Sequence, residues 1–343
     1  MRYFLIFFLA LSLFTCQTKT KLRSPFNTAE VTVIWEDSIS IRALEVLPGS
    51  IAFAGNNGVY GSYTLADSTL RVGRQEHLGK YPEFRAVAHT STDFFMLSVG
   101  TPALLFKTGS SGQMELVYAE EGPEVFYDAM AFWDNRNGIA VGDAQGGCLS
   151  MLITRDGGAH WSKIPCEQLP PALDGEGAFA ASNTNIAIIG NRCWIATSKS
   201  RILYSEDMGA SWVVANTPVK SEAASQGIYS LAFSDALTGF AIGGDYTKAA
   251  GNEFNKARTL DGGLSWESVA SGTDPGYKSC VQFVPETDGL GLVAVGFTGI
   301  SYSADGGITW RLLSNEPFYT LRFLNDKEAF TAGKGRLARI RFN

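Results

Sequence analysis

The sequence predicts an all-β protein, a closed β-propeller of seven four-stranded blades that follows an N-terminal signal peptide. The 343-residue chain has 37 glycines and 12% aromatic residues, and its short apolar runs are separated by Gly, Asn and Asp. An eight-residue phrase recurs four times, at spacings of 51, 54 and 44 residues between its Asp residues. Periods of about 40–50 residues are typical of propellers and solenoids. Seven short apolar phrases that end in glycine extend the repeat along the chain.

The first 16 residues, MRYFLIFFLALSLFTC, predict a signal peptide. One early basic residue precedes about a dozen apolar residues, fewer than the ~20 that span a bilayer. Cys16 ends a Leu-Phe-Thr-Cys phrase that resembles the lipobox of bacterial lipoproteins, in which this cysteine is lipidated after cleavage; ordinary cleavage is the alternative. Residues 17–29 are polar and predict a tether. We therefore expect an exported protein, either a lipoprotein of the bacterial periplasm or outer membrane or a secreted one.

The charge pattern and the histidines argue against several classes of partner. The net charge is −6, and Lys and Arg are scattered without a basic stripe, which disfavours nucleic acid. The chain has no CxxC pair, and its three histidines are far apart, so we expect no metal site. We also expect no cofactor, and a monomer.

Export makes the remaining cysteines informative. Cys148 and Cys166 lie nine residues either side of Gly157, so a hairpin at this glycine would place them opposite each other. We predict a disulfide between them. Cys193 and Cys280 have no such relation and are expected to be buried free thiols.

The glycine phrases define the expected blades. They end at Gly55, Gly100, Gly142, Gly190, Gly244, Gly296 and Gly333. An apolar stretch precedes each phrase and predicts an innermost strand: residues 41–46, 84–89, 127–132, 177–182, 228–233, 279–284 and 319–324. Residues 30–37 (EVTVIWED) predict a strand that joins the last blade and closes the ring. The propeller is expected to occupy residues 30–343.

The recurring phrase predicts a structural turn between the third and fourth strands of a blade. TRDGGAHW, SEDMGASW, TLDGGLSW and SADGGITW share Ser or Thr, Asp, Gly and Trp at fixed positions. The carboxylate can accept hydrogen bonds from backbone N–H groups of the turn, and the glycine allows positive φ. The tryptophan can bury its ring against its own blade. The residues of this turn are Asp156 and Trp161, Asp207 and Trp212, Asp261 and Trp266, and Asp305 and Trp310.

These phrases resemble the Asp-box of BNR repeats, which occurs in sialidases and many other propellers. The combined pattern GIAVGD…TRDGGAHW and GFAIGGD…TLDGGLSW resembles the photosystem II stability/assembly-factor-like propellers, within the wider WD40/YVTN/BNR-like group of exported proteins. That resemblance implies binding of a protein partner during assembly of a membrane complex, through basic residues on one face. Proteins of this group often carry the label oxidoreductase.

A binding site is expected on the face opposite the Asp turns, where the segments after the glycine phrases and before the innermost strands meet. Tyr229 and Tyr319 lie near starts of innermost strands, and a long loop runs over residues 243–257. The expected binding residues are Arg42, Arg85, Asp143, Arg192, Asp245, Tyr246, Asn252 and Lys256. The alternative is that they only solvate a rim and line a wet central channel.

The predicted function is a protein-binding or assembly scaffold at the cell envelope. The first alternative is a sialidase-like glycoside hydrolase that uses Asp128 and Glu176 as a carboxylate pair and binds a carbohydrate with Arg42 and Arg85. The second, an oxidoreductase, follows only from the label. The GKGRLA phrase near the C-terminus has no βαβ unit after it, so it does not predict a dinucleotide site.

Overall fold

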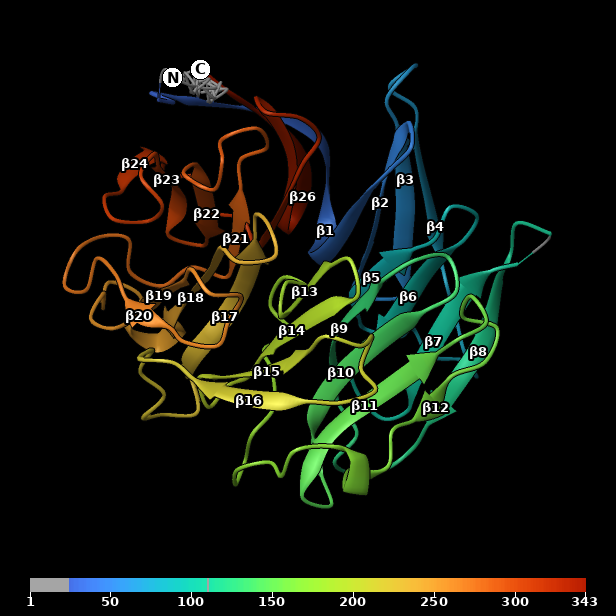
Figure 1. Ribbon diagram of the computed structural model, residues 1–343. Helices are drawn as coiled ribbons and strands as arrows, with labels where there is room; N and C mark the ends of the chain where they lie inside the picture. The colour runs from blue at the N-terminus through green and yellow to red at the C-terminus, as the bar shows by residue number, and fades with distance from the viewer. Residues whose placement is uncertain (1–24, 110) are drawn as a thin grey trace, which may run out of the picture.

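The computed structural model describes residues 25–109 and 111–343. Within these ranges the strands form six antiparallel sheets, five of four strands and one of six, arranged around a common axis (Figure 1). The six-stranded sheet consists of β25 (Thr320–Phe323), β26 (Glu328–Phe342), β1 (Ala29–Leu47), β2 (Ser50–Gly55), β3 (Val59–Thr64) and β4 (Leu70–Arg74).

The five remaining sheets each contain four strands that follow one another in the chain. They are β5 (Phe84–His89), β6 (Phe94–Ser98), β7 (Ala103–Thr108) and β8 (Met114–Glu120); β9 (Tyr127–Phe132), β10 (Gly138–Gln145), β11 (Cys148–Thr154) and β12 (Ser162–Lys163); β13 (Ile186–Ile189), β14 (Arg192–Ala196), β15 (Arg201–Ser205) and β16 (Val213–Asn216); β17 (Gln226–Phe233), β18 (Gly239–Asp245), β19 (Lys256–Thr259) and β20 (Glu267–Ser268); and β21 (Cys280–Phe283), β22 (Leu292–Gly296), β23 (Gly299–Ser303) and β24 (Arg311–Ser314). Two 3₁₀ turns, η1 (Cys166–Gln168) and η2 (Tyr246–Lys248), lie in connections.

The first and last strands close the ring, as the sequence predicts, and lie side by side in Figure 1. The first half of β1 pairs with β26 and its second half pairs with β2. The N–H of Phe342 donates to the carbonyl of Lys327 at 2.8 Å, so β26 doubles back on itself near Gly335, where φ is +82°. The innermost strands contact each other in the order β1, β5, β9, β13, β17, β21, β25 and back to β1.

The β-propeller is confirmed, but the prediction of seven separate blades is wrong, because the described residues form six sheets. The reason is that β1 is one continuous 19-residue strand. The sequence assigned its two halves to a last and a first blade. In the structure it carries hydrogen bonds to both neighbours and joins their strands into one sheet.

The innermost strand predicted over residues 177–182 is also wrong. These residues form no strand, and the innermost strand of this sheet is β13, which pairs with β14 across a turn at Gly190 and Asn191. The apolar run that ends at Gly190 predicts a second strand, because it resembles the other glycine phrases. It is the first, and the turn after it is a two-residue hairpin loop.

The segment that was expected to form this strand crosses and closes the central channel. Asn183 donates to the carbonyl of Val87 in β5 at 2.7 Å and accepts from the N–H of Met130 in β9 at 3.0 Å. Thr320 in β25 donates to the carbonyl of Ser182 at 2.9 Å. Further bonds reach β17 and the residue before β21. The channel is therefore blocked by residues 181–184, and a continuous wet channel is excluded.

All four Asp turns have the predicted geometry. In the first, Asp156 accepts from the hydroxyl of Thr154 at 2.9 Å and from the N–H of His160 at 3.0 Å, and the N–H of Gly158 donates to Thr154 at 3.0 Å. The same bonds recur around Asp207, Asp261 and Asp305. Trp161 is buried and Trp212, Trp266 and Trp310 are half-buried. These turns therefore stabilise the connections between the third and fourth strands of their sheets.

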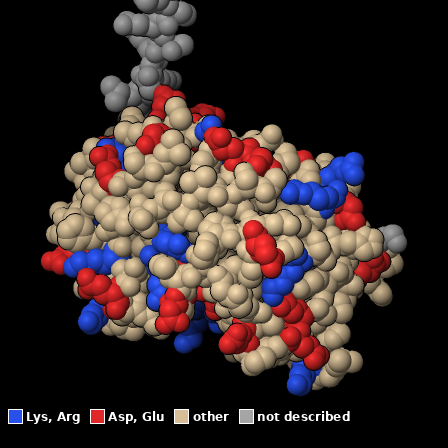
Figure 2. All heavy atoms as spheres, turned by 60° about the horizontal axis from the view of Figure 1, so that its bottom comes forward, with Lys and Arg blue, Asp and Glu red and all other residues tan. Residues whose placement is uncertain are grey.

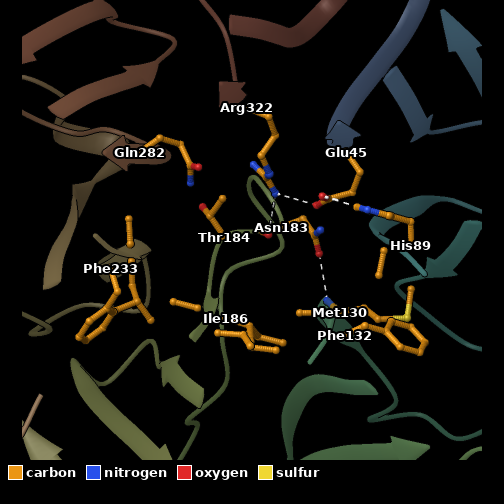
Figure 3. Close-up of a pocket in the computed structure, with 16 residues that line it drawn as sticks. Glu45, His89, Met130, Phe132, Asn183, Thr184, Ile186, Phe233, Gln282 and Arg322 are labelled. Carbon is orange, nitrogen blue, oxygen red and sulfur yellow. Dashed lines mark hydrogen bonds and ion pairs between the residues drawn. The ribbon is translucent and has the colours of Figure 1, made fainter. Parts of the chain in front are cut away.

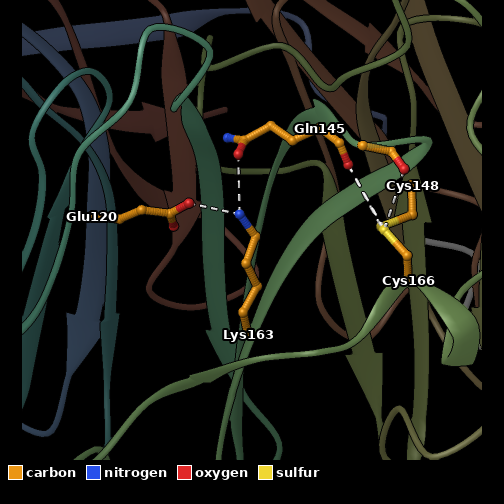
Figure 4. Close-up of a disulfide and its surroundings, with 6 residues drawn as sticks. Glu120, Gln145, Cys148, Lys163 and Cys166 are labelled. Carbon is orange, nitrogen blue, oxygen red and sulfur yellow. Dashed lines mark hydrogen bonds and ion pairs between the residues drawn. A yellow bond between two sulfur atoms is a disulfide. The ribbon is translucent and has the colours of Figure 1, made fainter.

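Cys148 and Cys166, the pair singled out from the sequence, form a disulfide with Cα atoms 5.5 Å apart (Figure 4). It joins β11 to η1, which lies 13 to 15 residues before the segment that blocks the channel. Beside it, Lys163 donates to Glu120 at 2.6 Å and to Gln145 at 3.1 Å. Cys193 and Cys280 are buried free thiols.

The predicted tether ends earlier than residue 29. The ring of Phe26 is 6% exposed and stacks on Phe342 with centroids 5.0 Å apart, so the propeller begins before β1. The described residues exclude the predicted signal peptide, the predicted lipidation site Cys16 and residues 17–24 of the predicted tether. No helix in the described part of the chain is both long and apolar enough to span a membrane.

Candidate ligand-binding site

The propeller has two faces at the ends of its central axis. The Asp-box face carries the Asp turns. The opposite face, here called the connection face, carries the loops between second and third strands and the connections from one sheet to the next. A cavity lies at the mouth of the channel on each face, and residues 181–184 separate the two.

The cavity on the connection face, here called the arginine–tyrosine pocket, has a volume of about 360 Å³. It brings together side chains from β1, β5, β17, η2 and the segments before β21 and β25. Its walls are two arginines and six aromatic rings, and its floor is the channel-blocking segment. The lining residues are Arg42, Arg85, Phe179, Ala180, Ala181, Tyr229, Tyr246, Tyr277, Phe297 and Tyr319.

The two arginines of this pocket differ in their partners. Arg85 forms an ion pair with Glu83 at 2.5 Å. Arg42 is half-buried, lies over the ring of Tyr319 with 4.0 Å from its guanidinium carbon to the ring centroid, and makes one long bond of 3.5 Å to the carbonyl of Ala181. Within the described residues no carboxylate forms an ion pair with Arg42. Burial, and then the nearby positive charge of Arg85, lower the pKa of Arg42. A ligand carboxylate placed between the two guanidiniums would offset both the burial of the Arg42 charge and its repulsion by Arg85.

The aromatic rings form a connected cluster. Phe179 and Tyr229 stack with centroids 3.7 Å apart, and Tyr277 meets Tyr229 edge-on at 4.8 Å and stacks with Phe297 at 5.1 Å. Tyr246 is 52% exposed at the rim. Burial raises the pKa of Tyr229 and of Tyr277, so both phenols stay neutral and can offer only apolar surface and hydroxyl groups to a ligand.

Two carboxyl groups lie below the pocket, around the backbone of residues 177–180. Asp128 is 0% exposed, and neither of its oxygens has a hydrogen-bond partner of good geometry among the described residues. Burial, and then the Asp143 carboxyl, raise the pKa of Asp128 well above its ordinary value, although the N–H groups of Ala178 and Ala180 and the charge of Arg85 partly oppose this. Burial also raises the pKa of Asp143 to about 6.

The Asp143→Asn substitution is expected to raise the free energy of unfolding at pH 7 by about 1–2 kcal/mol, after allowance for the partial exposure of this side chain. Because the pKa of Asp143 is higher in the folded than in the unfolded chain, its contribution favours folding below about pH 4 and is lost as the pH rises through about 6. Denaturant unfolding at pH 4.5 and pH 7 checks this. The exposed Asp174→Asn is the control, and an equal pH dependence in the wild type and Asp143→Asn would contradict the assignment.

The structure leaves neither member of the predicted hydrolytic pair accessible to a substrate. Glu176 is 2% exposed and is held in an ion pair by Arg201, whose Nε lies 2.9 Å from it, while the N–H of Leu173 donates to it at 2.8 Å. Asp128 is sealed below the pocket and interacts with Asp143 instead. Neither carboxyl faces a cavity in which a sugar could lie, so their assignment as a catalytic pair is wrong.

The other predicted binding residues divide between the two faces. Asp245 and Asn252 line a third cavity, of about 540 Å³, formed by the long loop on the connection face; Asp245 accepts from the N–H of Thr247 at 2.9 Å. Lys256 is 0% exposed, and its ammonium group donates to three oxygens at 2.8–2.9 Å, so it is structural. Arg192 bonds to the carbonyl of Ala236 at 2.8 Å on the Asp-box face. Lys256 is therefore inaccessible to a ligand, and Arg192 does not lie on the connection face, where the sequence placed it.

The cavity on the Asp-box face is about 340 Å³ in volume and is shown in Figure 3. Arg322 bonds to Glu45 at 3.4 Å and to the carbonyl of Asn183 at 3.0 Å, and Glu45 lies 3.8 Å from His89. The charged groups here already pair with one another. This cavity therefore presents less unmet charge to a ligand than the arginine–tyrosine pocket does.

Sequence reasoning missed three rings of the arginine–tyrosine pocket, those of Phe179, Tyr277 and Phe297. Phe297 directly follows a glycine phrase, and Tyr277 lies just before an innermost strand, so both satisfy the positional rule that selected the other residues. Phe179 carried no such signal, because its segment was predicted to be a strand.

The described residues contain no group of three His, Cys, Asp or Glu side chains placed to hold a metal ion. The GKGRLA phrase lies within β26, with no helix after it. On the face visible in Figure 2, acidic and basic side chains are interspersed and form no continuous basic area.

The fold and these turns define a β-propeller of the Asp-box type. The BNR/Asp-box repeat family matches residues 301–312, which contain the fourth Asp turn. No curated protein sequence matches the chain.

Solved structures show where the whole fold occurs. The structure of YCF48 bound to D1 peptide aligns with a TM-score of 0.65 at 13% identity, over 93% of this chain and 98% of that chain. YCF48 from Cyanidioschyzon merolae aligns with a TM-score of 0.63 at 13% identity, over 92% and 98%. The GH74 xyloglucanase from Xanthomonas campestris aligns with a TM-score of 0.61 at 13% identity, over 92% of this chain but only 54% of that chain.

These matches confirm the resemblance to BNR/Asp-box propellers of the photosystem II assembly-factor-like kind. At 13% identity, the structural matches show the fold alone.

Proposed function

We propose that this protein is a binding scaffold at the cell envelope, and that it holds a segment of a partner protein in the arginine–tyrosine pocket. The observation that carries the proposal is Arg42, a half-buried guanidinium that lies over Tyr319 and forms no ion pair among the described residues. Such a group needs an anion, and the six rings around it offer apolar surface to the rest of the ligand.

A protein segment suits this pocket better than a neutral carbohydrate does. A sugar could stack on the rings, but it would leave Arg42 without an anionic partner. An acidic side chain or a chain-terminal carboxylate supplies that charge, and the aromatic rim accepts the neighbouring side chains. The structure of YCF48 bound to D1 peptide shows that a protein of similar fold binds a peptide.

Export and a lipid anchor are part of the same proposal. The apolar run before Cys16 supports a signal peptide. The Cys148–Cys166 disulfide supports an oxidising compartment. Labelled palmitate should be incorporated into the full chain and not into the Cys16→Ser variant. Equal labelling of the two would refute the anchor.

Peptide selection tests the binding function. A phage-displayed library of random 12-residue peptides is panned against the full chain, and the binding of enriched peptides is measured by fluorescence polarisation. We expect enriched peptides to carry Asp, Glu or a free carboxyl terminus, and to bind Tyr246→Ala several-fold more weakly. Leu264→Ala is the matched control, because Leu264 is 64% exposed in an Asp turn on the opposite face. A library with no enriched peptide, or equal loss in both variants, would refute the proposal.

A further inference from the structure

Another cavity on the connection face lies next to the arginine–tyrosine pocket. This cavity, here called the Leu78 pocket, has a volume of about 480 Å³. It is lined by the connection from β4 to β5, the loop between β6 and β7, and Glu121 after β8. Its apolar lining includes Leu78, Tyr81, Val99, Pro102 and Leu104. No part of the site described above uses these residues.

Leu78 is held in an unusual conformation at the rim of this pocket. His77 and Lys80 exchange backbone hydrogen bonds of 2.9 and 3.0 Å, which makes Leu78 and Gly79 the two central residues of a tight turn. Both have positive φ, +50° for Leu78 and +76° for Gly79. Turns of this kind favour Asn or Gly at the first central position, and a left-handed leucine is disfavoured by about 1–2 kcal/mol.

Leu78 is also more exposed than any other large apolar side chain in the described residues, at 87%. Tyr81, on the same rim, is 50% exposed, and its ring lies 5.2 Å from the guanidinium carbon of Arg74. The turn therefore presents apolar surface to solvent in a fixed geometry. Burial of Leu78 by a partner would remove this apolar surface from water and so contribute hydrophobic free energy to binding.

The two pockets meet at one ion pair. Glu83 lines the Leu78 pocket and Arg85 lines the arginine–tyrosine pocket, and their side chains are joined at 2.5 Å. These residues are two positions apart, which is about 7 Å in an extended chain. One extended peptide can therefore place side chains in both pockets with about two to four residues between them.

We infer that the Leu78 pocket is a second subsite for the ligand of the arginine–tyrosine pocket, and that it takes an apolar side chain of the bound protein segment. This inference rests on the proposed function. The segment carries an apolar residue at the Leu78 pocket and a carboxylate at Arg42. Charge complementarity with Arg42 and the junction at Glu83 and Arg85 favour this occupant over a separate small molecule.

Leu78→Asn tests the subsite without loss of the fold. Asparagine tolerates the left-handed conformation, so the variant should unfold at the same or a higher denaturant concentration than the wild type. Peptides enriched from the random 12-residue library should carry an apolar residue and a carboxylate with about two to four residues between them, and should bind Leu78→Asn about tenfold more weakly. Leu237→Asn, at a 54% exposed leucine on the Asp-box face, should bind them as the wild type does.

Three results would overturn the inference, and they separate it from the proposed function. Peptides that lose binding to Arg42→Gln but bind Leu78→Asn normally would refute the subsite and leave the binding scaffold intact. Absence of any enriched peptide would refute both. A wild-type dimer that Leu78→Asn converts to a monomer in sedimentation experiments would show that a second copy of the chain covers Leu78 instead.

Discussion

Arg42→Gln is expected to weaken the binding of a selected acidic peptide by about 10- to 100-fold, because a charge-assisted hydrogen bond in a half-buried pocket contributes about 1.5–3 kcal/mol. The amide keeps much of the side-chain volume beside Tyr319 but removes the charge. Since Arg42 has no ion pair among the described residues, its loss leaves no carboxylate of the protein without a partner. The fold should therefore be stable, and the change in the peptide dissociation constant can be measured directly.

Arg192→Gln is the matched control for this substitution. Arg192 bonds to the carbonyl of Ala236 and to Glu206, on the Asp-box face, so its replacement should leave peptide affinity unchanged. If Arg42→Gln and Arg192→Gln bound the peptide equally well, the assignment of the anion site to the arginine–tyrosine pocket would be wrong.

The paired substitution Cys148→Ser and Cys166→Ser is expected to lower the free energy of unfolding by about 3 kcal/mol, because the bond closes a loop of 19 residues in the unfolded chain. The chain that leads from Cys166 to the pocket floor is also held beside this bond, where the N–H of Ala172 donates to the carbonyl of Gly147 at 2.8 Å. The floor of the arginine–tyrosine pocket should therefore lose order as well. Denaturant unfolding of the oxidised wild type and the variant measures the first effect.

The effect on the pocket has its own readout and control. At pH 7 without denaturant, the paired variant should bind the peptide more weakly than the oxidised wild type does. The reduced wild type should show the same loss of peptide affinity. A loss of stability below about 1 kcal/mol, with unchanged affinity, would show that the disulfide supports neither the fold nor the pocket floor.

The Asp turns could be predicted fully from the sequence because each is a local structure. The bonds of Asp156 run to residues within four positions, so the eight-residue phrase contains everything that the turn requires. The regular spacing of the four copies then indicated the propeller. The sheet count could not be read in this way, since it depends on whether β1 breaks between its two partners, and no residue within β1 distinguishes a break from a continuous strand.

The channel-blocking segment was missed because its signal resembles that of a strand. The residues that lead into it, 177–182, have the sequence GAFAAS, which is short and apolar, as the true innermost strands are. What sets it apart is the polar run Ser182–Asn185 that follows, whose side chains bond to strands almost 100 residues away in the sequence. Such partners cannot be identified without the fold. The error removed Phe179 from the predicted site and placed Glu176 in it.

Burial explains the remaining failures among the candidate site residues. Asp128, Glu176 and Lys256 lie on the correct face by position, but their side chains point into the protein. A sequence gives the position of a polar residue along a strand, whereas its accessibility depends on neighbouring strands. Innermost strands all begin on the connection face, so the sequence placed Arg42, Arg85, Tyr229 and Tyr319 on the correct face. It also placed Tyr246 there, because this residue follows the second strand β18, which ends on the same face.

Site-specific photocrosslinking tests the central claim, that a protein partner binds at the arginine–tyrosine pocket. The photoreactive residue p-benzoylphenylalanine replaces Tyr246 at the pocket rim, or Leu264 on the Asp-box face, in the full chain expressed in its native cells. The account predicts a discrete adduct with another protein at position 246, suppressed by Arg42→Gln and by a selected peptide, and none at position 264. An adduct at position 264 alone, or an adduct at position 246 that neither Arg42→Gln nor the peptide reduces, would contradict it.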